Sequence, residues 1–225
     1  MPAIPRSLFV LALFYGGMVC IAGVLGNKQV GLGPLSRLGE LIGRGPLAVE
    51  AGIFAFLLLV VTSSAVAELF GRATANRLVL LGFIPLVVSI LLALLVLALP
   101  AADEMAPERL AAFNTIMGST PRIWIGGILA YGTSQLLNVT IFTALKRNEG
   151  KLLWLRAGIA SVLSQVVDTL IFITIAFYGV FPIYDLLVGQ MFAKVVLSVV
   201  LVPPLIYLAV ALARRLDGPG GAARA

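Results

Sequence analysis

The chain has 225 residues, of which 60% are hydrophobic and 12% charged, and its mean hydropathy is +1.08. Soluble domains rarely exceed about half apolar residues, so this composition excludes a soluble protein and predicts an all-α, polytopic membrane protein. The net charge of +6 does not indicate nucleic-acid binding, because the basic residues cluster at the ends of apolar stretches, as topology signals do.

Six stretches are apolar over the roughly 20 residues needed to cross about 30 Å of hydrocarbon. They are residues 8–25, 47–67, 78–99, 123–145, 155–178 and 186–212. Between them lie a glycine-rich loop (26–45), a basic turn (68–77), a proline-containing acidic loop (100–122), a basic loop (146–151) and a short turn around Pro182. Pro203 and Pro204 should kink or interrupt the sixth helix. We therefore predict one membrane transport domain over 1–225 with six transmembrane helices.

Lysine and arginine are distributed unevenly between the two sides that six spans would create. With the N-terminus inside, ten are cytoplasmic: Arg6, Arg72, Arg77, Lys146, Arg147, Lys151, Arg156, Arg214, Arg215 and Arg224. Five lie on the opposite side: Lys28, Arg37, Arg44, Arg109 and Arg122. Because basic segments stay in the cytoplasm, both termini are predicted to be cytoplasmic.

The residue inventory argues against an enzyme. The chain has no histidine, which rules out a Ser/His/Asp set and an HExxH zinc motif, and it has no GxxxxGK[ST] run for ATP. Cys20 is the only cysteine, so no disulfide or cysteine metal set can form within the chain. Asp168 is the only aspartate placed within a span, which disfavours a two-aspartate intramembrane protease. We expect no catalytic residues, no metal and no cofactor.

Polar residues recur at helical spacing in the fourth and fifth stretches. The first set is Tyr131, Ser134, Gln135 and Asn138, and the second is Ser161, Ser164, Gln165 and Asp168. Both follow the spacing i, i+3, i+4, i+7, which places each set on one face of its helix. Two such faces on consecutive membrane helices indicate that both helices turn toward an interior cavity.

Asp168 lies deep inside the fifth predicted span, and Lys194 lies deep inside the sixth. A charge at a helix centre costs roughly 2.5–3.5 kcal/mol, so retained charges usually mark a functional site. Counted at about 1.5 Å per residue, Asp168 and Lys194 lie at similar heights, as do Gln135 and Gln165. The sequence therefore predicts a shared polar site near the midplane for a substrate, an ion or a proton.

The same residues also have structural interpretations. Serines in membrane helices bond their own backbone, and amide side chains can hold helices together. Asp168 and Lys194 could neutralise each other, and Glu68 could pair with Arg72 one helical turn later. A membrane-assembly protein whose polar faces only join helices is therefore a competing hypothesis.

The predicted lining suits a planar, neutral heterocycle that carries both hydrogen-bond donors and acceptors. A carboxylate such as Asp168 can accept two N–H bonds from a guanine-like edge, while amide side chains serve carbonyls and ring nitrogens. Four aromatic side chains could stack on such a ring: Tyr131, Phe142, Phe172 and Phe192.

At these residues the sequence resembles the queuosine precursor transporter family, also called the VUT family. The matching stretches are Glu68-Leu-Phe-Gly71, Gly118-Ser-Thr-Pro-Arg-Ile123, Ala130-Tyr-Gly-Thr-Ser-Gln-Leu-Leu-Asn138, Trp154-Leu-Arg156, Ser161-Val-Leu-Ser-Gln-Val-Val-Asp-Thr-Leu-Ile-Phe172 and Lys194. The sequence departs from the family at Ser64, where an aspartate is usual, and at Leu57, where a proline is frequent.

The resemblance implies a six-span, multi-pass protein of the bacterial inner membrane, distantly like the substrate-binding subunits of energy-coupling-factor vitamin importers. It implies import of 7-cyano-7-deazaguanine or 7-aminomethyl-7-deazaguanine for salvage into the queuosine modification of tRNA. The functional candidates carried over are Glu68, Arg122, Gln135, Asn138, Arg156, Gln165, Asp168 and Lys194.

The leading hypothesis is thus a secondary or facilitated importer of a 7-deazapurine. Substrate-binding residues would be Tyr131, Ser134, Gln135, Asn138, Ser164, Gln165, Asp168 and Lys194. Arg122 and Arg156 would cap the cavity at its outer and inner ends, with Glu68 as a gating residue. The alternatives are a binding subunit of an ATP-driven vitamin importer and a purine or vitamin transporter of other specificity. The expected partners are the small-molecule cargo and the lipid bilayer, with no nucleic acid, and a homodimer is left open.

Overall fold

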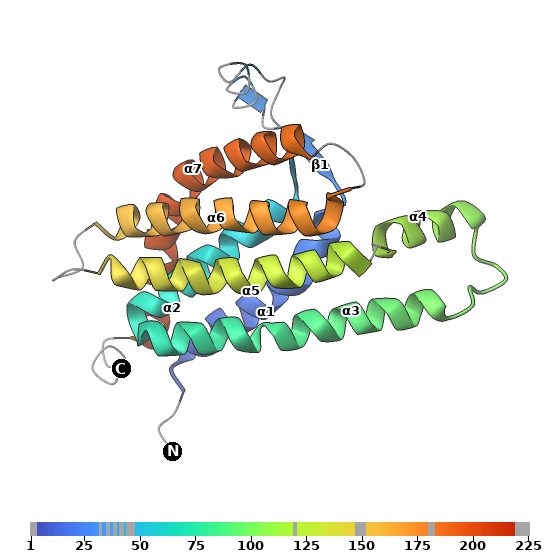
Figure 1. The fold of residues 1–225 in the computed structure, drawn as a ribbon. Coiled ribbons are helices and arrows are strands. Elements are labelled where there is room, and N and C mark those ends of the chain that lie inside the picture. The colour runs from blue at the N-terminus through green and yellow to red at the C-terminus, as the bar shows by residue number, and fades with distance from the viewer. Residues whose placement is uncertain are drawn as a thin grey trace.

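A computed structural model describes residues 4–31, 33–34, 37, 40, 43, 48–118, 121–146, 152–179 and 183–218. Its helices are α1 (Arg6–Leu25), α2 (Gly52–Leu81), α3 (Phe83–Ala98), α4 (Pro107–Met117), α5 (Pro121–Ala144), α6 (Leu153–Phe177) and α7 (Tyr184–Asp217). The long helices form a bundle (Figure 1). The prediction of an all-α, polytopic membrane protein is confirmed. Arg44, Arg147, Lys151, Pro182 and Arg224, used in the predictions above, lie outside the described residues.

Within the described residues, five helical stretches are long and apolar enough to cross a membrane. The longest, Gly52–Ala98, holds α2 and α3 and runs for 47 residues, about 70 Å if straight, far more than one crossing needs. Its helical geometry breaks at Gly71, where φ is 83° and ψ is 166°. This conformation is open essentially to glycine alone, so Gly71 divides α2 into two helical segments.

The segment after Gly71 runs alongside α1 in the same direction. A Cβ on Gly82 would lie 2.9 Å from the ring of Tyr15, and the Cys20 thiol lies 3.6 Å from the Pro85 carbonyl oxygen. Residue 82 lies beside residue 15 and residue 85 beside residue 20, so the two segments are parallel. The basic turn predicted over 68–77 is too long, because one glycine is enough to end the helix and the flanking residues stay helical.

Two loops contain more structure than the sequence predicted. In the acidic loop over 100–122, α4 begins with Pro107 at its first turn and Glu108 beside it, both favoured at a helix start. Within the glycine-rich loop lies β1 (Gln29–Gly31), which pairs with β2 (Ala48–Glu50) as a two-stranded antiparallel sheet. β2 occupies the start of the stretch predicted as the second span, whose helix begins only at Gly52. Conversely, α7 continues through Pro203 and Pro204, so the two prolines do not interrupt it.

The interior lies between α2, α5, α6 and α7, and α3 is peripheral, with no buried residue. Its large apolar side chains are exposed on a surface that suits lipid. The start of α1 and the end of α7 are joined, since the Ser7 backbone N–H donates to Asp217 Oδ1 at 2.9 Å. The start of the first helix and the end of the last helix therefore lie at the same end of the bundle, as Figure 1 shows.

Candidate substrate-binding site

A cavity of about 360 Å³ lies between the helices. It is lined by the end of α1 and the starts of α2 and α5, and it therefore lies in the half of the bundle away from Ser7 and Asp217. Its walls come from every helix and are mainly apolar, and a cavity of this size suits one small ring system. Aromatic side chains on the wall are Phe56, Trp124, Tyr131, Phe172 and Phe177. Among the described lining residues, the charged ones are Glu50, Asp168 and Lys194.

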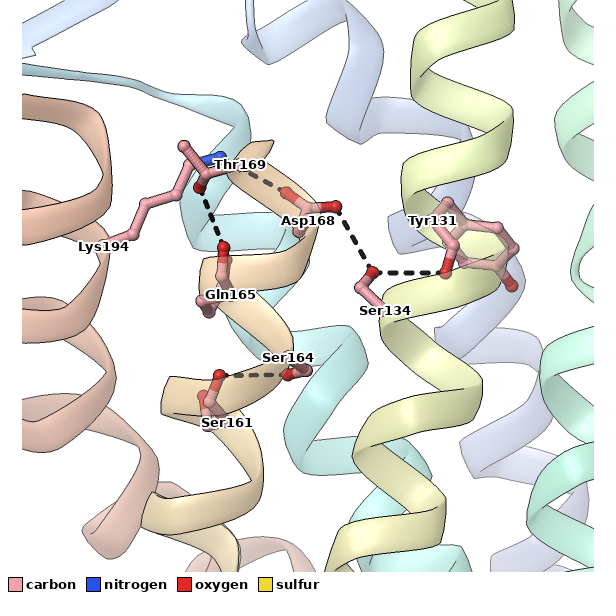
Figure 2. A network of polar contacts seen from close by, with 8 residues as sticks. All are labelled: Tyr131, Ser134, Ser161, Ser164, Gln165, Asp168, Thr169 and Lys194. Atoms are coloured by element: carbon pink, nitrogen blue, oxygen red, sulfur yellow. Dashed lines mark hydrogen bonds and ion pairs between the residues drawn. The ribbon is translucent and has the colours of Figure 1, made fainter. Parts of the chain in front are cut away.

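Asp168 is the centre of the polar contacts at the cavity. Lys194 Nζ lies 3.3 Å from Asp168 Oδ2, and the Ser134 hydroxyl donates to Asp168 Oδ1 at 3.3 Å (Figure 2). The carboxylate thus joins α5, α6 and α7. The contact confirms the prediction that Asp168 and Lys194 lie at similar heights, which follows from the constant rise of a helix per residue.

Tyr131 forms the wall next to this carboxylate. Its hydroxyl donates to the Val79 carbonyl oxygen at 2.9 Å and lies 3.1 Å from the hydroxyl of Tyr15. The ring packs edge-on against Phe83, with centroids 5.0 Å apart. A Cβ on Gly82 would lie only 2.2 Å from the Tyr131 hydroxyl, so glycine is required there for Tyr131 to reach the end of α2.

Beneath the cavity, amide side chains of α5 meet two serines of α2. The Ser63 hydroxyl lies 3.2 Å from Gln135 Oε1. Asn138 Nδ2 donates to Ser64 Oγ at 3.0 Å and to Ser63 Oγ at 3.2 Å. Sequence reasoning did not include these serines in the site, although their position in an apolar stretch was visible. Ser64, where the resembled family usually carries aspartate, is therefore an acceptor for Asn138.

The polar side chains beneath the cavity form a buried layer. Several polar atoms in this layer have no hydrogen-bond partner among the described residues. They are Gln135 Nε2, Asn138 Oδ1 and both amide atoms of Gln165. Gln135, Asn138 and Gln165 are fully buried. Buried polar groups are normally paired, and an unpaired one costs about 1–3 kcal/mol. The layer therefore has unused capacity to bind a polar ligand, as a donor and as an acceptor.

Both polar stripes predicted from the sequence face the interior of the bundle. Of the eight predicted binding residues, Tyr131, Asp168 and Lys194 line the cavity. The other five lie below it in the buried layer and not on its wall: Ser134, Gln135, Asn138, Ser164 and Gln165. The Ser164 hydroxyl donates to the Ser161 carbonyl oxygen at 3.0 Å (Figure 2). This is a bond to the backbone of its own helix, as expected if Ser164 has a structural role.

An ion cluster lies at the end of the layer away from the cavity. Glu68 pairs with the buried guanidinium of Arg156 and lies 3.5 Å from Lys146 Nζ. Arg156 also stands over the Phe142 ring, 4.6 Å from its centroid. Arg72, the partner considered from the sequence, donates instead to Thr140 Oγ1 at 3.1 Å. Phe142 is thus engaged here, away from the cavity wall.

Arg122, predicted to cap the outer end of the cavity, is not among the residues that line it. Its Nε donates to the Ile175 carbonyl oxygen at 3.0 Å, and its Nη2 donates to the Tyr178 carbonyl oxygen at 2.8 Å. Both acceptors belong to the last turn of α6, whose carbonyls have no partner within the helix. The contacts make Arg122 a cap of α6.

Glu50 is the cavity residue that sequence reasoning missed. It ends β2 and lines the cavity together with Asp168 and Lys194. Burial raises the pKa of its carboxyl above the usual value, and Asp168 adds to this, whereas Lys194 acts in the opposite direction. An acidic residue inside the apolar stretch 47–67 indicates a functional site for the same reason as Asp168 does, and this was visible in the sequence.

Comparisons with known proteins give a consistent result. The family model described as "Putative vitamin uptake transporter" matches residues 50–209. A curated protein of Bacillus subtilis (strain 168), named "Probable queuosine precursor transporter", is 31% identical over 184 residues, which is 77% of this chain and 76% of that protein. No solved structure matches.

Proposed function

This chain belongs to the vitamin uptake transporter family, and from that premise we propose that it imports 7-cyano-7-deazaguanine or 7-aminomethyl-7-deazaguanine. The name of the Bacillus subtilis relative supports a queuosine precursor as cargo. Transport is secondary or facilitated, across a bacterial inner membrane, and it supplies salvage for tRNA modification.

Six crossings with both termini in the cytoplasm belong to the same proposal. The break at Gly71 supports two crossings within Gly52–Ala98 in place of one. The contact between Ser7 and Asp217 keeps the first and last helix ends together, as an even number of crossings requires. The excess of lysine and arginine predicted for that end supports a cytoplasmic location.

The unpaired amides beneath the cavity are the observation that carries the choice of cargo. Gln165 has an unused donor and an unused acceptor on one planar group, one helical turn from Asp168. The edge of a deazaguanine presents both kinds of group, so it can satisfy a layer that mixes amides with a carboxylate. A purely apolar cargo would leave these atoms unpaired.

The roles follow from position. Asp168 accepts N–H groups of the base, and Lys194 pairs with that carboxylate when the site is empty. Gln135, Asn138 and Gln165 orient the carbonyl and the ring nitrogens once the base moves below the cavity. The pair of Glu68 and Arg156 closes the path at the inner end, and its opening would release the base.

Gln165→Leu tests this role against a purely structural one. Because neither amide atom has a partner among the described residues, leucine should leave the melting temperature of the empty protein unchanged or raise it. Binding of 7-cyano-7-deazaguanine should weaken by about tenfold to hundredfold, the effect of losing one or two buried hydrogen bonds. Titration calorimetry and thermal unfolding of the purified protein measure both quantities.

The matched control is Gln29→Leu on β1, whose side chain is exposed. It should change neither base binding nor the melting temperature. A lower melting temperature of Gln165→Leu with unchanged binding would instead support the membrane-assembly hypothesis. Uptake into liposomes that contain this chain alone separates an importer from a binding subunit, since the latter needs an ATPase partner.

A further inference from the structure

Among the described residues of the cavity wall, two carboxylates face a single ammonium group. Glu50 comes from β2, Asp168 from α6 and Lys194 from α7. With all three ionised, the wall carries one negative charge in excess. An uncompensated charge in a cavity with mainly apolar walls is unfavourable, and a cation within the cavity removes the cost.

Lys194 is already engaged and cannot fully compensate both carboxylates. Its ammonium lies 3.3 Å from Asp168 Oδ2, and both side chains are about nine-tenths buried. Asp168 also accepts from Ser134, so its position is set from two sides. Glu50 is therefore the carboxylate whose charge is left for a ligand.

Glu50 is held at the cavity by backbone pairing. In the small sheet it stands opposite Gln29, and the N–H of the next residue, Ala51, donates to the Lys28 carbonyl oxygen at 2.8 Å. The strand ends where α2 begins at Gly52, whose Cβ position is only 2.6 Å from the Ala22 carbonyl oxygen. This close packing against α1 fixes the start of α2, and with it the place of Glu50.

We propose that Glu50 binds a protonated amine on the cargo, so that the cavity prefers an amine-bearing base to a neutral base with the same ring. This inference rests on the proposed function and narrows it to one of the two cargoes, 7-aminomethyl-7-deazaguanine. The two bases differ only in their substituent, which is a protonated aminomethyl group in one and a neutral nitrile in the other.

Asp168 and Glu50 lie at different depths, and they contact different parts of the cargo. Asp168 and the amides below it serve the ring edge, which the two bases share. Glu50 precedes the first residue of α2, whereas Asp168 lies well inside α6, so Glu50 lies nearer the end of the bundle, where a substituent on the far side of the ring would reach. Phe56 and Trp124 line the same cavity. Aromatic faces also attract an ammonium, which favours the same cargo.

The experiment uses the full-length protein in lipid nanodiscs and compares the binding of the two bases by calorimetry. Wild type should bind the aminomethyl base more tightly than the cyano base. Glu50→Gln should weaken binding of the aminomethyl base by about tenfold or more, as for a lost charge-assisted hydrogen bond, and change binding of the cyano base less than about twofold. Glu108→Gln on the exposed surface of α4 is the matched control and should change neither.

Each alternative outcome has its own meaning. If wild type prefers the cyano base, or if Glu50→Gln weakens both bases equally or neither, Glu50 does not recognise an amine and the inference is wrong. If neither base binds wild type, the proposed function itself fails, and the inference fails with it. Should Glu50→Gln not fold, Glu50→Asp decides: it keeps the charge, so it must retain the preference for the amine.

Discussion

A buried carboxylate and a buried ammonium matter for stability mainly because removing either one leaves the other as an uncompensated buried charge. Asp168 and Lys194 are both nearly inaccessible to solvent. Asp168→Asn keeps the shape but leaves the ammonium with only the more distant Glu50, which should cost roughly 3 kcal/mol of unfolding free energy. Asp168→Asn combined with Lys194→Met should restore most of the melting temperature and still not bind the base.

Thermal unfolding and base binding of these two variants check this prediction, with Asp103→Asn in the exposed loop before α4 as control. Unchanged base affinity in Asp168→Asn would remove Asp168 from the site. An equal loss of stability in the single and double variants would show that the pair is not what the substitution disturbs.

Glu50 gives the empty protein a pH dependence of its own. Burial raises its pKa in the folded state above the ordinary 4.5, so the folded protein holds the proton more tightly than the unfolded chain. The stability from this group is complete below pH 4.5 and is lost as the pH rises through the raised folded-state pKa. The melting temperature of wild type relative to Glu50→Gln should therefore fall as the pH increases above 4.5. If the melting temperatures of wild type and Glu50→Gln changed with pH in the same way, this prediction would be wrong.

At the scale of elements, Gly71 decides where the helical stretch Gly52–Ala98 divides into two segments. Its φ of 83° and ψ of 166° are strained for any residue with a Cβ. Gly71→Ala should therefore cost about 1–3 kcal/mol of unfolding free energy, although no atom lies near its Cβ position. Gly17→Ala, in the middle of α1 and also with open space around it, should be neutral or stabilising. Thermal unfolding in one detergent compares the two, and equal effects would contradict the assigned role of Gly71.

The sequence was sufficient for features that depend on one helix at a time. Apolar length located the helices, and the spacing of Ser134, Gln135 and Asn138 identified the buried face of α5. Depth counting brought Asp168 to the height of Lys194. These predictions need only helical rise and rotation, which are constant.

The features that the sequence did not supply depend on how separate elements pack. Nothing local shows that Ser63 and Ser64 of α2 face α5, or that Arg122 reaches across to the end of α6. Glu50 was missed because its importance comes from a strand pairing that places it over a cavity built by other helices. The five predicted binding residues found below the cavity reflect the same limit, since depth along a helix does not locate the cavity's floor.

On the scale of the whole molecule, the two ends of the bundle differ. The end with the termini is closed by Glu68, Arg156 and Lys146. The other end holds the cavity, which reaches inward as far as Asp168 and Lys194. Under the proposed topology and function, this arrangement corresponds to the outward-facing state of an alternating-access importer, in which the same polar layer would later be reached from the cytoplasmic side.

Cys20, the only cysteine of the chain, tests this orientation without any substitution. It lines the cavity and is partly accessible. A small, cationic, membrane-impermeant methanethiosulfonate should therefore modify it in spheroplasts, where the outer face is presented, and react several times more slowly in inside-out vesicles. Cys20→Ser should abolish labelling on both sides.

A bound 7-deazaguanine should protect Cys20, because cargo and reagent occupy the same cavity. Faster labelling from the inside-out face would reverse the proposed topology, whereas fast labelling from outside without protection would place the cargo elsewhere.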